Sequence, residues 1–419
     1  MTGRPEYFGS FLDKIVEGLL VLLPPAALLG PWAGSGRVFG YRILVVLLVG
    51  CAVTGWIYPI WVRRFSRAAC AIVVVAVAWA VTGVVGAMRL GPRRDLSSLM
   101  GAGLALAGAW SVARLISDRH IRRERALRDV AIGWAVAVWV GAPLAVWEIL
   151  TARHLGTYAD GAWRNHPGLY RQPATWLTNP NLYAVFLAVG SVWVGVVGVR
   201  SATRWVRIAA IATAVTGLGL LLATDSRIVY AALLLAVMVR LWAVRRWCWV
   251  LPGVVMAVVV VIVVTHLHQA GLVWHRFIGV LIHHNDEGPS SFAVRTTLLA
   301  WGLALVMEYP LLGAGPGGYR ANILAAPKRW FPHGKSDPHN GILEIASQYG
   351  LVVTALVAVC WCLAIGRCWR SRRWWGAALI TAMPVLSLAN STYLVQSVNQ
   401  LGWLVCVLAA SSSRQETPQ

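Results

Sequence analysis

The sequence predicts an all-α polytopic membrane protein, and three observations support this prediction. The chain of 419 residues is 58% hydrophobic and only 13% charged, whereas a soluble protein carries about 25% charged residues. Its mean hydropathy is +0.64. Apolar runs of about 20 residues recur along the whole chain, and each is long enough to cross a bilayer. A membrane β-barrel is disfavoured, because it shows short alternating segments instead.

Twelve apolar runs are candidate transmembrane spans. Each is long or apolar enough to be a helix that crosses the bilayer. In chain order they lie at about 15–30, 42–62, 68–88, 96–116, 130–150, 180–199, 206–223, 228–243, 248–265, 341–366, 375–390 and 393–411.

Arginine clusters predict the direction of these spans. They follow the even-numbered spans, in the ranges 63–67, 119–128, 200–207, 240–246 and 367–373. Positive residues favour the cytoplasmic side, so both termini are expected inside. The short loop with Arg93 and Arg94 is the single exception.

This topology divides the chain into four parts. Residues 1–265 hold spans 1–9 and an outer loop at 151–179, and residues 266–338 form a large outer loop before span 10. Residues 339–411 hold spans 10–12, and residues 412–419 form a cytoplasmic tail. The apolar run Phe292–Met307 is interpreted as a helix on the outer membrane surface. Counting it as a span would place the arginines of 367–373 outside.

The distribution of the basic charge (net +21) and of the seven cysteines disfavours a nucleic-acid-binding protein, a disulfide-rich protein and a zinc protein. Much of the basic charge lies in short loops beside apolar runs, where it sets topology and meets anionic lipid headgroups. Nucleic acid is therefore not an expected partner. The cysteines fall within apolar runs or at their basic ends, without a disulfide framework or a convincing zinc spacing.

The stretch Tyr309–Gly350 is the densest in Gly, Pro, His, Lys and Arg. We predict that a helix starts within it, with Asp337 as N-cap and Pro338 first, which puts His339 and Asn340 in the first turn. That end of a helix favours an anion and helps to keep His339 neutral, whereas Asp337 acts in the opposite direction. A surface histidine at a capped helix start is the alternative.

Glu344 lies four residues after Asn340 and shares its helix face. It is a candidate to orient Asn340 or His339. A structural cap or an interhelical hydrogen bond is the alternative role.

Three arginines on the outer side are candidates for binding a phosphate or diphosphate. Arg227 ends the sequence TDSR between spans 7 and 8, next to Ser226 and Asp225, while Arg295 interrupts an apolar run and Arg320 follows a glycine-rich turn. A guanidinium presents a planar fork of donors that suits phosphate. Alternatively, Arg227 reaches the membrane interface with Asp225 as its partner.

The glycine-rich turn contains Gly313 and Gly315. Its backbone N–H groups could approach an anion, but a plain turn is favoured.

We predict no metal site. The large outer loop contains the histidines 266, 268, 275, 283, 284 and 333, but no HExxH spacing accompanies them. The acids of the outer side are scattered, and there is no DxD-type pair. A GxSxG nucleophile motif is also absent from the sequence.

The order of these motifs resembles the O-antigen ligase/polymerase superfamily of bacterial envelope glycosyltransferases. The resemblance is carried by TDSR at 224–227, the helix with Arg295, PLLGAG at 310–315 and DPHNGILEIASQYG at 337–350, and it covers about residues 180–410. Within the superfamily, the chain is most similar to the lipopolysaccharide O-antigen ligases.

The resemblance implies a GT-C-like glycosyltransferase in the bacterial inner membrane with its active site facing the periplasm. The donor would be a polysaccharide on undecaprenyl diphosphate and the acceptor a sugar hydroxyl of lipid A-core, with no metal, nucleotide or other cofactor. His339 would be the general base, and Arg227, Arg295 and Arg320 would bind the diphosphate. The supporting residues would be Ser226, Gly313, Gly315, Asp337, Asn340 and Glu344.

Three other functions remain open. An O-antigen polymerase uses the same donor with a second lipid-linked glycan as acceptor, and a protein O-oligosaccharyltransferase accepts a peptide. A polysaccharide or lipid transporter is disfavoured, because few charges lie within the predicted spans.

Overall fold

The computed structural model describes residues 4–35, 38–57, 67–117, 123–155, 171–177, 179–244, 291–326, 337–389 and 393–411. The helices are α1 (Arg4–Leu29), α2 (Gly40–Ile57), α3 (Arg67–Leu90), α4 (Ser97–Ser117), α5 (Arg123–Thr151), α6 (Pro180–Gly198), α7 (Arg204–Ala223), α8 (Arg227–Ala243), α11 (Ser291–Glu308), α12 (Gly318–Ala325), α13 (Gly341–Arg370), α14 (Trp374–Leu386) and α15 (Ser397–Ala410). The 3₁₀ turns are η1 (Gly30–Ala33), η2 (Gly91–Arg93) and η5 (Thr175–Leu177), and the strands β1 (Gly34–Ser35) and β2 (Val38–Phe39) pair antiparallel.

The predicted all-α membrane class is confirmed. Seven described helices are long and apolar enough to cross a bilayer, and α2, α14 and α15 contain shorter apolar helices. Every predicted span except the ninth coincides with a described helix. The ninth, at 248–265, lies outside the described residues, so the total of twelve spans and the division into four parts remain predictions.

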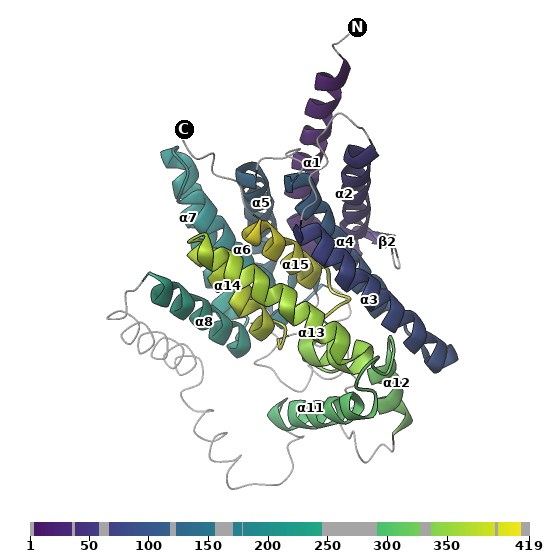
Figure 1. Cartoon of the computed structure of the whole chain (residues 1–419). Coiled ribbons are helices and arrows are strands. Elements are labelled where there is room, and N and C mark those ends of the chain that lie inside the picture. Colours follow the sequence, from purple (N-terminus) through teal and green to yellow (C-terminus); the bar gives the residue numbers. More distant parts are fainter. Residues whose placement is uncertain are drawn as a thin grey trace.

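The apolar run Phe292–Met307, which we interpret as a surface helix, forms the helix α11. It is not among the seven candidate spans. Figure 1 shows α11 and α12 together at the end of the bundle opposite to the start of α1. They border the N-terminal end of α13, where the candidate site residues gather.

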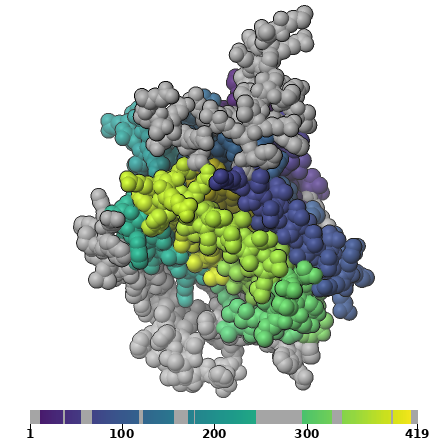
Figure 2. Space-filling model, in the orientation of Figure 1, coloured from purple at the N-terminus to yellow at the C-terminus, as the bar shows by residue number. Residues whose placement is uncertain are grey.

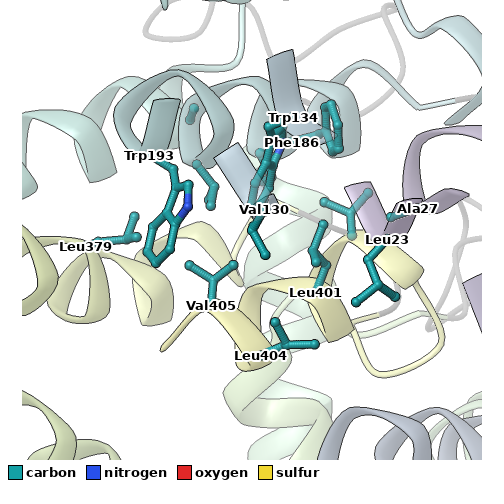
Figure 3. Close-up of a cluster of buried hydrophobic side chains, with 14 of the residues drawn as sticks. Leu23, Ala27, Val130, Trp134, Phe186, Trp193, Leu379, Leu401, Leu404 and Val405 are labelled. Atoms are coloured by element: carbon teal, nitrogen blue, oxygen red, sulfur yellow. The ribbon is translucent and has the colours of Figure 1, made fainter. Parts of the chain in front are cut away.

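The main core contains residues of α1, α5, α6, α14 and α15 (Figure 3), together with residues of α2, α4, α7 and α8. Trp134 of α5 and Phe186 of α6 are almost fully buried there, with ring centroids 5.6 Å apart. Leu23 of α1 and Leu401 of α15 pack into the same cluster. This core joins the first and last helices of the chain.

A second core joins α3 to α13, which lie side by side across the face seen in Figure 2. Trp79 of α3 and Tyr349 of α13 are both buried, with ring centroids 5.1 Å apart. The hydroxyl of Tyr349 is 2.8 Å from that of Ser98 on α4. Contacts with α3 and α4, in the N-terminal part of the chain, therefore fix the N-terminal half of α13.

The helix α13 is broken at Gly350, which has φ 82° and ψ 173°. The break deprives the carbonyls of Ser347 and Gln348 of their helical donors, and the N–H groups of Ala314 and Gly315 replace these at 2.8 and 2.9 Å. The N–H of Leu351 donates to Pro310 O at 2.7 Å. The sequence predicted an unbroken helix over 341–366, because nothing local to Gly350 indicates hydrogen-bond partners 33 to 41 residues earlier in the chain.

We expect Gly350→Ala to destabilise the fold by about 3 kcal/mol or more, and thus to lower the Tm in detergent. A Cβ on Gly350 would lie 2.1 Å from Leu311 O, and the positive φ is itself unfavourable for alanine. Gly366→Ala, in the same helix but with open space around its Cβ, is the matched control and should keep or slightly raise the Tm. Equal Tm values for the two variants would contradict the break.

Candidate functional site

The site is built around the first turn of α13, and this turn differs from the prediction. Asn340, not Asp337, is the N-cap: its Oδ1 accepts the N–H groups of Ile342 and Leu343 at 3.0 and 3.1 Å. The helix begins at Gly341. The prediction that His339 and Asn340 lie in the first turn, after Pro338 as first residue, is therefore wrong. Two good capping residues stand three apart, and the second one caps.

His339 lies immediately outside this cap. Its φ of 48° puts a non-glycine residue in the left-handed region, which costs about 1–3 kcal/mol and is enriched at functional sites. His339 is half-buried, and the preceding residue, Pro338, is buried. On its other side, the N–H of Gly341 donates to Ser387 O at 3.1 Å. The backbone on both sides of the imidazole is thereby fixed.

Glu344 is 2% exposed and binds the connection between α14 and α15. Its carboxylate accepts the N–H of Tyr393 at 2.6 Å and that of Leu394 at 3.4 Å. These contacts correspond to the structural alternative rather than to the orientation of His339 or Asn340. They also explain why α15 begins at Ser397 and not at the predicted 393.

Arg295 lies on α11, which packs against the first turn of α13. Leu298, Leu305 and Leu343 share a small core with Tyr319 of α12, whose hydroxyl donates to Leu298 O at 2.7 Å. Arg295 is half-buried, and burial lowers the pKa of its guanidinium from the ordinary value. An arginine nevertheless stays protonated at neutral pH.

Asp337 lies within electrostatic reach of this small core. Burial raises the pKa of the Tyr319 phenol above its ordinary value, and the charge of Asp337 acts in the same direction. Arg320, the next residue of α12, is exposed. Asp337, Arg320 and His339 therefore lie at the same end of the bundle.

The glycine-rich turn has a structural role. The N–H groups of Ala314, Gly315 and Gly317 are taken by Ser347 O, Gln348 O and Gln348 Oε1. The N–H groups of Gly313 and Gly318 are bonded to Tyr309 O and Gly315 O. None of these five donors is left for an anion.

The turn is also pressed against α3. Gly315 has φ 93°, and a Cβ on it would lie 2.6 Å from the backbone of Gly86. Gly313 has φ 71°, and a Cβ on it would lie 2.3 Å from the backbone of Gln348. The geometry agrees with the plain-turn alternative for both glycines.

Arg227 lies in a second group, at the start of α8. It is exposed, and no hydrogen bond or ion pair joins it to another described residue, including Asp225. The hydroxyl of Ser226 donates to Asn181 Oδ1 on α6 at 2.8 Å. The helix α14 contacts both α8 and α13, and it connects this group to the one around His339.

Two buried polar residues outside the first turn of α13 were missed from the sequence, Glu148 and His154. Glu148 is fully buried near the C-terminal end of α5 and accepts the N–H groups of Ala174 and Thr175 at 2.8 and 2.9 Å. His154 Nδ1 is 3.2 Å from its other oxygen. An acid inside an apolar run was a usable signal for Glu148.

No group of three or more His, Cys, Asp or Glu side chains that could hold a metal occurs in the described part of the chain. The six histidines of the large outer loop lie outside that part. The absence of a metal site thus stays a prediction.

Comparison with known families matches one segment of the chain. Residues 212–358, about a third of the sequence, match the family model described as O-antigen ligase. No curated protein matches the chain. The matched segment extends from α7 to α13 and contains every site residue predicted from the sequence.

We expect Glu344→Ala to destabilise the protein by about 2–4 kcal/mol, because two buried N–H groups lose their acceptor. The measurement is the Tm in detergent, with the exposed Glu124→Ala as control. A Glu344→Ala protein of normal Tm that lacks activity would instead support the orienting role.

Proposed function

We propose that the chain is a lipopolysaccharide O-antigen ligase, from the premise that residues 212–358 match the family model described as O-antigen ligase. The donor is a polysaccharide on undecaprenyl diphosphate, and the acceptor is a sugar hydroxyl of lipid A-core. The reaction takes place at the periplasmic face of the bacterial inner membrane. The observation that carries the proposal is His339, held in a left-handed conformation immediately before α13, the helix against which α11 with Arg295 packs.

His339 acts as the general base in this proposal. It takes the proton of the acceptor hydroxyl while the oxygen forms a bond to the anomeric carbon of the donor sugar. The bond from that carbon to the diphosphate oxygen breaks, and its electron pair leaves with the diphosphate. A positioned base contributes about 10²–10⁴-fold in rate. This single displacement inverts the anomeric configuration.

The arginines bind the leaving group. Arg295 is half-buried, and a charge in such a site interacts more strongly with a diphosphate than one in water does. Arg227 and Arg320 are exposed and have no partner among the described residues. Cations so placed can neutralise the diphosphate without a metal ion, so activity is expected to persist in a chelator.

The acceptor separates the alternatives within the superfamily. A polymerase joins the same donor to a second lipid-linked glycan, and a protein O-oligosaccharyltransferase joins it to a peptide. A purified assay that offers one donor and each acceptor in turn tests the ligase proposal directly. Transfer to a lipid-linked glycan or a peptide, but not to lipid A-core, would overturn it.

The diphosphate role predicts that arginine cannot be replaced by lysine. We expect Arg227→Lys and Arg295→Lys each to lose most of the transfer activity, because an ammonium does not reproduce the fork of guanidinium donors. Arg93→Ala removes an exposed charge on η2 and is the control, with activity close to wild type. Normal transfer by both lysine variants would show that the fork is not needed.

The base role predicts that His339→Ala folds and still binds undecaprenyl diphosphate, yet transfers about 10²–10⁴-fold more slowly. Transfer is measured with purified protein and followed by lipopolysaccharide gels of a complemented deletion strain. The product linkage should be inverted relative to the donor. Near-normal transfer would remove the base assignment, and a retained linkage would remove the single displacement.

A further inference from the structure

The hydrogen bond between Ser226 and Asn181 connects the candidate diphosphate site to a part of the chain outside the matched segment. Ser226 Oγ donates to Asn181 Oδ1 at 2.8 Å, across 45 residues of sequence. Ser226 is 2% exposed and directly precedes Arg227. Asn181 lies in the first turn of α6 and is half-buried. The bond therefore joins two helix starts next to a candidate cation.

Ser226 is the N-cap of α8, but its hydroxyl does not cap that helix. An N-cap serine normally accepts an N–H of its own first turn, a contact worth about 1 kcal/mol. Here the hydroxyl donates to another helix instead. The sequence thus forgoes a local stabilising contact and makes a bond that fixes α8 relative to α6.

The turn before Arg227 is tightly held on its other side. Asp225 has φ 51°, a left-handed conformation for a non-glycine residue. The Thr224 hydroxyl donates to Leu221 O at 2.7 Å, and the Tyr230 hydroxyl donates to Leu222 O at 2.9 Å. With the Asn181 bond, the backbone that carries Arg227 is fixed from both α7 and α6.

Asn181 is itself firmly placed. Asn179 caps α6 by accepting the N–H groups of Asn181 and Leu182 at 2.9 and 3.4 Å. The segment before it is held by Glu148, which accepts the N–H groups of Ala174 and Thr175. The backbone of Asn181 is therefore fixed at the position where its side chain accepts the Ser226 hydroxyl.

We propose that Asn181 is a positioning residue for Arg227. Through Ser226 it fixes the start of α8, so that the Arg227 guanidinium, which has no partner among the described residues, is presented to the donor diphosphate. This inference rests on the proposed function. It adds a residue of α6 to a donor site that is otherwise built from residues 212–358.

A double-mutant cycle tests the inference. The full-length protein in detergent is titrated with undecaprenyl diphosphate, using wild type, Asn181→Ala, Ser226→Ala, Arg227→Ala and the double variant of Asn181 and Arg227. We expect Asn181→Ala and Ser226→Ala each to raise the Kd about 2- to 10-fold, the effect of losing one neutral hydrogen bond. Arg227→Ala should raise it about 10- to 100-fold, and the double variant should bind no more weakly than Arg227→Ala.

Thr213→Val is the matched control. It also removes an interhelical side-chain bond, from Trp139 Nε1 at 2.9 Å, but at a distance along α7 from the turn. Its Kd should equal that of wild type. The Tm of each variant is measured alongside, and Ser226→Ala replaces Asn181→Ala in the cycle if the latter does not fold.

The outcomes separate the inference from the proposed function. A wild-type Kd for Asn181→Ala, or the same fold-loss from Asn181→Ala with and without Arg227, overturns the positioning role alone. Binding by Arg227→Ala at wild-type affinity overturns the diphosphate role of Arg227 and the inference with it. The inference is supported if Asn181→Ala raises the Kd in the wild-type protein but not in the Arg227→Ala protein. A merely structural role of Asn181 would raise the Kd by the same factor in both proteins.

Discussion

Backbone polar groups that leave a helix within an apolar bundle must find partners within the protein, and this constraint shapes the end of the bundle at which α13 begins. The break at Gly350 is possible because the turn before Gly318 supplies N–H groups to the exposed carbonyls. The connection before α15 is possible because the buried Glu344 accepts two of its N–H groups. Glu148 does the same for the segment before η5. Irregular backbone is thereby kept in place beside the apolar helices.

Such irregular segments are where the chain can present polar side chains outward. If α13 continued through Gly350 as a regular helix, its carbonyls would not bond to the turn at residues 310–318. The helix α12, which carries Arg320, would then lose its contact with α13. The left-handed conformation of His339 likewise depends on the bond from Gly341 to Ser387 and on the capping of α13 by Asn340. The energy lost in the strained backbone is offset by packing around it, as in other functional sites.

The candidate residues form two groups. His339, Arg295 and Arg320 gather where α11 and α12 meet the start of α13. Arg227 belongs to α8 and is held by α6 through Ser226, and α14 contacts the elements of both groups. Our proposal therefore requires the donor diphosphate to lie between these two groups of cations.

The sequence by itself determined the class of protein and the position of nearly every described helix, because hydrophobic length and basic flanks are local properties. It also placed the candidate site within the matched segment, through the short motifs around Arg227, Gly313 and His339. Only the tertiary structure decided that Asn340 caps α13, that α13 breaks at Gly350, and what Glu344 and Asn181 bind. Glu344 and Tyr393 are 49 residues apart, and Ser226 and Asn181 are 45 apart. Contacts over such separations depend on how the helices pack, and no local pattern of residues encodes them.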